Sequence, residues 1–432
     1  MESVLSPFRS AWRIADLRKK LIVTALLLLV YRLGVFIPVP GMSADVLADF
    51  ASSQRGGLFG YLNIIGGGAF ERASIFAMSI TPYINSSIII QLLTIAIPAL
   101  ERLQKEGGEE GRKKLAEWTR YGTVILGFLQ ATFMYIGFRD AITERNLLSY
   151  LTVTLALSAG TAFIMWLGEQ INEYGIGNGI SLIIFVNIIS SGPNAFKALY
   201  AIVVGYSFEG KLALGILIVL GIVAVFVAMV VVVIYVTEAE RRIPVQYAKR
   251  VMGRKLVGGQ STHIPIKVNV AGVMPIIFAM SILSFIPTVI SLVNPNPQSK
   301  FLQSLINFSS NPLYMLVTAV LVLFFTFFYT LIAFNPVEVA NNIRKNGGFI
   351  PGIRPGKPTS DYISKVLNRV TWFGALFLAL VTILPSLMEF ITGVGNMWFG
   401  GTSLLIMVGV ALETAKAIES QLIMRHYKGF LE

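Results

Sequence analysis

Ten long runs of apolar residues, separated by short polar segments, dominate the hydropathy pattern of this chain. The runs cover residues 21–37, 73–97, 121–138, 147–168, 176–196, 212–236, 268–293, 312–334, 370–387 and 397–412. A helix rises about 1.5 Å per residue, so about 20 residues cross a hydrocarbon core about 30 Å thick. The pattern therefore predicts an all-α polytopic membrane protein with ten transmembrane helices. The fifth run is the weakest, because Asn178, Asn187, Ser190 and Ser191 interrupt it.

The ten predicted spans divide naturally into five and five. An odd number of spans in each half makes the second half enter the membrane from the opposite side. The count thus predicts two inverted halves, residues 21–196 and 212–412, around a central crevice, with a hinge loop at 197–211. Residues 1–20 are predicted to form a cytoplasmic amphipathic helix, and residues 413–432 a cytoplasmic tail.

The distribution of basic residues predicts the orientation of the chain. The net charge is +12, and 27 of the 35 Lys and Arg residues fall on the side of the membrane that holds both termini, against 7 on the other side. Short cytoplasmic loops carry an excess of Lys and Arg. Both termini are therefore predicted to be cytoplasmic, and Arg32 lies within the first span.

A short apolar segment precedes the second run and is too short to span a membrane. It contains Leu58, Phe59, Tyr61, Leu62, Ile64 and Ile65, and it is followed by Gly66, Gly67 and Gly68. Eight helical residues rise only about 12 Å, so the ends of such a helix need protein or water around them. Spacing alone leaves two interpretations open. The segment is either a short helix that blocks a channel and is attached by a glycine hinge, or a helix that lies on the membrane surface.

Two predicted cytoplasmic loops, residues 237–267 and 335–369, are basic and rich in Gly and Pro. They are long, and long ordered loops are usually functional. One reading is attraction to anionic lipid headgroups, worth about 1 kcal/mol per basic residue near the surface. The sequence PGIRPG, in which prolines and glycines frame Arg354, instead favours a specific contact with protein or RNA.

Catalytic and cofactor-binding patterns are absent from the sequence. The chain has no Cys, and His263 and His426 have no neighbouring ligands that would complete a metal site. Glu169, Glu389 and Glu413 fall near the ends of the apolar runs, whereas ion-coupled transporters usually need acidic residues or broken helices at the membrane midplane. We therefore expect a protein that is not an enzyme and has no cofactor, and the scarcity of such acids weakens a secondary transporter of a small solute, which stays open as the alternative function.

Several isoleucines lie at helical spacing on the predicted spans. Ile80 and Ile84 are four residues apart on the second span, and Ile184 and Ile188 repeat this spacing on the fifth. Residues four apart share a helix face. Isoleucine on a membrane helix most often faces lipid or packing neighbours, so spacing alone leaves a pore-lining role open.

Seven separated stretches resemble the bacterial SecY family of protein-translocation channel subunits, and the resemblance runs essentially from end to end. These stretches are GGGAFERASIFAMSITPYINSSIIIQLL, EGGEEGRKKLAEWTRYGT, GIGNGISLIIF, RRIPVQYAKR, QSTHIPIKVNVAGVMPIIFA, NGGFIPGIRPG and GGTSLLIMVGVALET. The resemblance implies a protein-conducting channel of the bacterial cytoplasmic membrane. Such a channel passes unfolded, signal-sequence-bearing polypeptides across the membrane and releases apolar segments sideways into lipid.

The resemblance also implies roles for residues. Residues 58–72 match the plug, although Glu71 stands where the family often has a small polar residue. The second and seventh spans match the lateral gate, joined there by the eighth. The six-residue pore ring corresponds to Ile80, Ile84, Ile184, Ile188, Ile277 and Ile406.

The implied partners are the SecE and SecG membrane subunits, the SecA ATPase and the ribosome, besides anionic lipids. The two basic loops match the docking surfaces for the motor and the ribosome, and Arg354 and Tyr427 match positions tied to motor-driven transport. The expected docking residues are Arg241, Arg242, Lys249, Arg250, Arg254, Lys255, Arg344, Arg354 and Tyr427.

Overall fold

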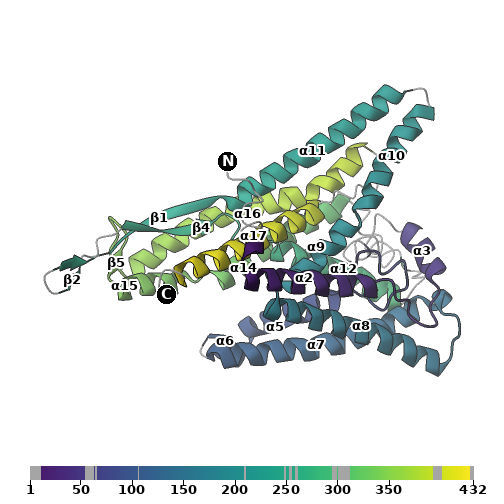
Figure 1. The fold of residues 1–432 in the computed structure, drawn as a ribbon, viewed down its shortest axis with the longest axis horizontal. Coiled ribbons are helices and arrows are strands. Elements are labelled where there is room, and N and C mark those ends of the chain that lie inside the picture. The colour runs from purple at the N-terminus through teal and green to yellow at the C-terminus, as the bar shows by residue number, and fades with distance from the viewer. Residues whose placement is uncertain are drawn as a thin grey trace.

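The computed structural model describes most of the chain as helices with a small β-sheet region at one end (Figure 1). The described residues are 11–53, 63, 66–105, 107–208, 211–247, 250–252, 255–257, 261–293, 299, 312–392 and 401–428. The helices of the first half are α2 (Ala15–Gly34), α3 (Ala44–Ser53), α5 (Thr81–Ala96), α6 (Pro98–Lys105), α7 (Gly108–Gly137), η1 (Arg139–Ala141), α8 (Leu147–Tyr174) and α9 (Gly179–Ser190). They are followed by α10 (Gly192–Phe208), α11 (Leu212–Glu238), α12 (Met274–Val293), α14 (Pro312–Ala333), α15 (Pro336–Lys345), α16 (Lys357–Thr392) and α17 (Gly401–Lys428).

Each of the ten predicted spans overlaps a helix, and the fifth also reaches into the start of α10. Besides α10, these helices are α2, α5, α7, α8, α9, α11, α12, α14, α16 and α17. Within the described residues, four helical stretches are by themselves long and apolar enough to cross a membrane: Leu147–Tyr174, Leu212–Glu238, Leu313–Lys345 and Lys357–Leu384. Together α5 and α6 make a further candidate, bent by 107°. The bend falls at Ile97, which is extended because Pro98 follows it.

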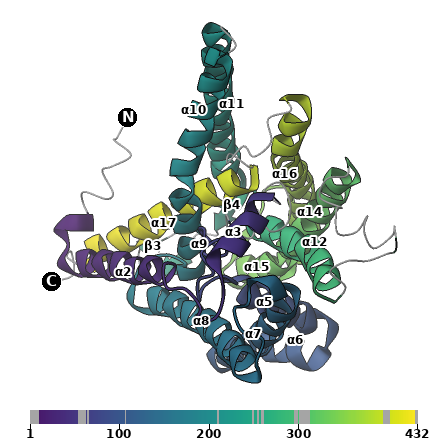
Figure 2. The ribbon, with the colours of Figure 1, turned by 90° about the vertical axis from the view of Figure 1, so that its right-hand side faces the viewer.

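The helices pack into two groups that share one apolar core. In the first half α7 packs against both α5 and α8, and in the second half α14 packs against both α12 and α16. The contacts of α5 with α12 and of α9 with α17 join the two groups. Helices α10 and α11 lie side by side and project from the rest of the molecule (Figures 1 and 2). The exposed surface of α11 is apolar, with Leu217 at 71% and Leu220 at 64% exposure, as suits lipid contact.

The second predicted span begins later than the apolar run suggested. The run starts at residue 73, but α5 begins at Thr81, where Pro82 is favourable in the first turn. Residues 66–80 instead form consecutive turns, and Ala73 and Ser79 have positive φ angles of 48° and 50°. Backbone bonds tie these turns to the chain after α2: the Val39 amide donates to the Ala73 carbonyl at 2.7 Å.

One further prediction about element boundaries is wrong. The hinge loop expected at 197–211 lies largely in helix α10, which ends at Phe208. The amphipathic helix predicted for residues 1–20 stays a prediction: residues 11–13 are helical, Ile14 is extended, and α2 then runs without a break from Ala15 into the first span. Leu17 on this extension is buried in one apolar cluster with Ile176 and Ile418, so packing continues the helix beyond the membrane-length run.

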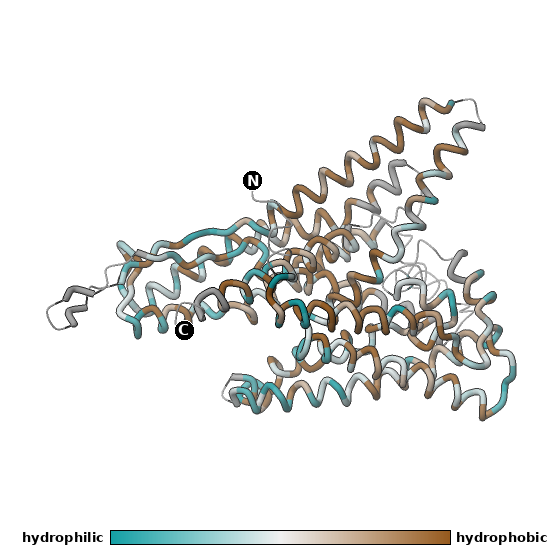
Figure 3. The backbone as a smooth tube through the Cα atoms, in the orientation of Figure 1, coloured by the Kyte–Doolittle hydropathy of each residue, from teal (hydrophilic) through white to brown (hydrophobic). Residues whose placement is uncertain are grey.

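The two basic loops pair with each other rather than lying separately. Strands β1 (Glu240–Tyr247) and β4 (Ser261–Lys267) form an antiparallel ladder, and β5 (Gly348–Phe349) pairs with the other edge of β1. Strands β2 (Arg250–Met252) and β3 (Lys255–Val257) form a second antiparallel pair. The expected loop 335–369 also contains α15 and the start of α16. Hydrophilic residues gather around this sheet and α15, away from the apolar helices (Figure 3).

A small core of its own holds this sheet region together. Alternate residues of β1, Ile243 and Val245, are buried on one face, where they join Ile343 of α15 and Ile363 of α16. The alternation follows the two-residue period of a strand. Both predicted loops therefore contribute to one packed unit (β1, β4, β5, α15 and the start of α16), which we call the cytoplasmic unit after the side of the membrane predicted for these loops.

Truncating this core should loosen the cytoplasmic unit without unfolding the membrane helices. Ile363 is completely buried, and replacing a buried Ile by Ala costs about 2–5 kcal/mol. We expect Ile363→Ala to make the unit's Lys and Arg sites more susceptible to trypsin, and exposed Tyr362→Ala to leave the cleavage rate unchanged. Equal cleavage rates for the two variants would contradict a common core for the two loops.

Candidate functional site

The six isoleucines singled out by sequence come together in one buried apolar cluster. They are Ile80, Ile84, Ile184, Ile188, Ile277 and Ile406, and each is at most 7% exposed. Four helices contribute them or begin directly after them: α5, α9, α12 and α17. The first half supplies four of the six, so the cluster is asymmetric.

Local structure explains how the isoleucine pairs face the same way. Ile80 is the residue that precedes α5, and its carbonyl accepts the backbone N–H of Ile84 at 3.1 Å. Ile184 and Ile188 lie one turn apart on α9. The side chains are branched and apolar, so a constriction made of them would offer no hydrogen bond to water or to a passing chain. The pore-lining role of the six residues stays a prediction.

The glycine turn that follows the predicted plug has polar contacts to α2 and to Asn63. The plug residues Leu58, Phe59, Tyr61, Leu62, Ile64 and Ile65 lie outside the described residues. The Arg32 guanidinium donates to the Gly67 carbonyl at 2.9 Å, and the Gly68 amide donates to the Asn63 carbonyl at 2.8 Å. The Glu71 amide donates to Asn63 Oδ1 at 3.3 Å.

Sequence reasoning missed the polar residues that surround this turn. Asn187 Nδ2 donates to the Tyr31 hydroxyl at 2.7 Å, and the Tyr31 ring stacks on Phe76 at 5.5 Å between centroids. The signals were present, because Arg32 is a charge inside the first span and Asn187 interrupts the fifth. The position of either residue in the sequence, however, does not indicate which partner it contacts in the fold.

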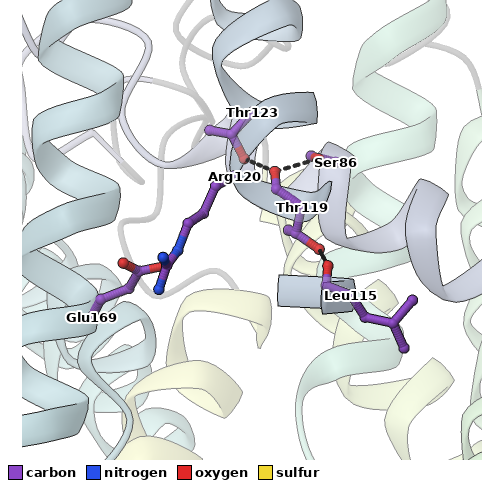
Figure 4. A network of polar contacts seen from close by, with 6 residues as sticks. All are labelled: Ser86, Leu115, Thr119, Arg120, Thr123 and Glu169. Atoms are coloured by element: carbon purple, nitrogen blue, oxygen red, sulfur yellow. Dashed lines mark hydrogen bonds and ion pairs between the residues drawn. The ribbon is translucent and has the colours of Figure 1, made fainter. Parts of the chain in front are cut away.

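The face of α5 opposite the isoleucines packs closely on α7. Ser86 Oγ donates to the Thr119 carbonyl at 2.8 Å, and the Thr123 hydroxyl donates to the same carbonyl at 2.7 Å (Figure 4). A Cβ added at Gly122 would lie 2.3 Å from Ser86 Oγ, so the helices approach closely there. This contact holds α5 to α7 of the first half, while α5 also touches α12 of the second half.

An ion pair links α7 to α8 near the contact between α5 and α7. Arg120 Nε lies 2.6 Å from Glu169 Oε1, with the Glu169 side chain 26% exposed (Figure 4). The pair gives Glu169 a partner at the end of the apolar run. A role as an ion-coupling carboxylate at mid-membrane is therefore not favoured by its surroundings.

Several predicted docking residues lie on the cytoplasmic unit. Arg241, Arg242, Arg344 and Arg354 are exposed, and Arg242 pairs with Glu240 at 2.7 Å. Lys249 and Arg254 lie outside the described residues, Arg250 and Lys255 belong to β2 and β3, and Tyr427 belongs to the last turn of α17. The structure thus brings these four arginines onto one unit.

The PGIRPG turn presents Arg354 in a fixed backbone. Gly352 and Gly356 have φ angles of 80° and 101°, which favour glycine, and the Thr359 hydroxyl donates to the Arg354 carbonyl at 2.9 Å. This bond anchors the backbone and leaves the guanidinium exposed. Among the described residues there is no group of three or more His, Cys, Asp or Glu that could hold a metal ion.

Comparison with known sequences identifies a family. The model of the SecY family matches residues 74–415. The protein translocase subunit SecY of Halalkalibacterium halodurans is 49% identical over 428 residues, covering 98% of each chain. SecY of Bacillus subtilis is 46% identical over 431 residues, covering 97% of this chain and 98% of the relative.

Solved structures share the fold at lower identity. A protein-conducting channel superposes with a TM-score of 0.65 at 18% identity, covering 94% of this chain and 93% of that one. Sec61 in the canine ribosome–channel complex from the endoplasmic reticulum gives a TM-score of 0.61 at 16% identity, covering 94% and 93%. These similarities support the helical channel fold.

Proposed function

Since this chain belongs to the SecY family and is a protein-conducting channel subunit of a membrane, we propose that its six clustered isoleucines form the collar through which unfolded polypeptides pass. The observation that carries this proposal is the convergence of six apolar residues from both halves into one buried cluster. A collar of branched apolar side chains closes by excluding water. It also accepts many sequences, because it offers no hydrogen bond that would select one.

We place the channel in the bacterial cytoplasmic membrane with both termini in the cytoplasm. The excess of Lys and Arg on that side and the hydrophilic cytoplasmic unit support this orientation. The seam between α5 and α12, with α14 packed beside α12, is the proposed lateral gate through which apolar segments enter lipid. Transfer free energy would then decide which segments leave the channel sideways.

The cytoplasmic unit is the proposed docking surface for the SecA motor and the ribosome. Its exposed arginines support such a contact, and channels of the same fold have been observed on ribosomes. The small subunits SecE and SecG are the proposed membrane partners, and the segment Leu58–Ile65 is the proposed plug on the extracytoplasmic side. Each of these roles follows from the family and from the positions in this sequence that match it.

Transport by purified protein tests the proposed function against a solute transporter. We expect proteoliposomes that contain this chain and its co-purified small membrane subunits to take up an unfolded secretory precursor when a SecA motor and ATP are supplied. The precursor becomes protected from added protease, whereas a folded precursor stays accessible. Absence of precursor uptake together with saturable uptake of a small solute would contradict the proposal.

The plug assignment has its own test. Because the chain has no Cys, two introduced cysteines are the only thiols present. We expect a cysteine at position 62 and another at position 84 to form a disulfide in the resting channel, and deletion of residues 58–65 to raise the resting ion leak. Reaction of position 62 only with surface probes would favour the membrane-surface helix instead.

A further inference from the structure

A charged side chain of the first predicted span is held by the glycine turn. Arg32 lies on α2, is partly buried, and donates to the Gly67 carbonyl at 2.9 Å. Its guanidinium carbon lies 5.5 Å from the centroid of the Phe36 ring. Ionisable residues within a membrane span are costly and usually functional. The contact therefore connects a charged residue, which is costly to place within a membrane span, to the hinge of the proposed plug.

The neighbouring Tyr31 continues this contact into the core. Its hydroxyl accepts the hydrogen bond from Asn187, which is completely buried on α9, and it is also hydrogen-bonded to Ser79. Ser79 lies in the turn segment, directly before Ile80. One tyrosine thus links three segments, α2, α9 and the turns before α5.

Gly67 fits tightly against two of these side chains. Its φ angle is 63°, and an added Cβ would lie 2.5 Å from Asn187 Oδ1 and 2.9 Å from the outer nitrogen Nη1 of Arg32. Neighbouring Gly68 has a similar backbone, with φ of 82°, but an added Cβ there would approach only the exposed side chain of Arg72. A side chain at position 67 would therefore collide with Arg32 and Asn187, whereas a side chain at position 68 would not.

Asn187 also adjoins the isoleucine collar, because it directly precedes Ile188 on α9. We propose that Tyr31, Arg32 and Asn187 are positioning residues that form a latch, coupling the collar face of α9 to the Gly66–Gly68 turn and keeping the resting channel closed. The proposal rests on the proposed function of the collar. A polypeptide that pushes Ile184 and Ile188 outward moves Asn187 with them. The contacts at Tyr31 and Gly67 then weaken, and the turn is released.

A pair of glycine variants isolates the latch from backbone strain. Both Gly67→Ala and Gly68→Ala force a side chain into a left-handed conformation, but only the first collides with the latch. In reconstituted full-length channels we expect Gly67→Ala to raise the resting ion conductance about tenfold, which corresponds to about 1.4 kcal/mol. Gly68→Ala should stay within about twofold of the unmodified channel, by the same scale. Equal leak from the two variants would overturn the latch.

Arg32 variants decide the proposal if Gly67→Ala does not fold. Arg32→Met removes the donor and should leak and also export precursors with defective signal sequences. Arg32→Lys keeps one donor and should restore most of the closure. If the resting ion conductance rises in Ile84→Asn channels but not in Arg32→Met channels, the latch is overturned and the proposed collar stands. If the resting ion conductance does not rise in Ile84→Asn channels, both proposals are overturned, since the latch acts through the collar.

Discussion

Resting channels that carry Ile84→Asn or Ile406→Asn are expected to conduct ions, whereas those that carry Leu or Val at the same positions are expected to stay closed. Both isoleucines are buried in the common cluster, at 7% and 1% exposure. An amide placed there needs hydrogen-bond partners, and a buried amide without them costs about 1–3 kcal/mol. Water that enters the collar supplies those partners, so the closed state loses about 5- to 150-fold in relative population.

The Leu and Val variants are the matched controls for this effect. They keep an apolar side chain of nearly the same volume, and such exchanges are well tolerated in cores. The measurement is the conductance of single resting channels in planar bilayers, together with export of precursors that carry defective signal sequences. Equal leak from Asn and Leu variants would mean that the collar does not close by excluding water.

Arg354→Glu should abolish ATP-driven transport while the protein remains folded and inserted in the membrane. The side chain is exposed, and the neighbouring backbone is fixed by Gly352, Gly356 and the bond from Thr359. An exposed charge contributes little to stability, about 0–1 kcal/mol, so loss of transport would report lost docking or lost coupling to the motor.

The control for Arg354 is Lys365→Glu, the same change of charge at an exposed position on α16. Its transport should stay near that of the unmodified protein in the vesicle assay with SecA and ATP. Normal transport by Arg354→Glu, or equal loss in both variants, would contradict a specific role for the PGIRPG turn.

Hydrophobic periodicity was sufficient to predict the helices and the shared faces of the two isoleucine pairs, whereas Ile277 and Ile406 joined the predicted ring only through the family resemblance. Periodicity failed where tertiary contacts override it. Residues 73–80 are apolar enough to extend α5, yet bonds to the end of α2 and the positive φ angles at Ala73 and Ser79 hold them in turns. The expected loops gave no strand signal strong enough to predict that β1 would pair with both β4 and β5.

The polar contacts of the site were the least predictable part. Arg32 and Asn187 were visible as polar interruptions of apolar runs, but their contacts with Gly67 and Tyr31 join positions far apart in sequence. Spacing on one helix can indicate a shared face, as for Ile184 and Ile188. It cannot indicate which distant backbone carbonyl will accept a guanidinium hydrogen bond.

Crosslinking from the collar to a stalled secretory chain tests the central claim most directly. In this cysteine-free chain, a single cysteine at position 84, 277 or 406 can carry a photoreactive probe, with position 217 on the exposed face of α11 as the control. We predict crosslinks from all three collar positions to a soluble secretory segment held in transit, and none from position 217. A translocating segment that crosslinks to position 217 but to no collar position would contradict passage through the isoleucine collar.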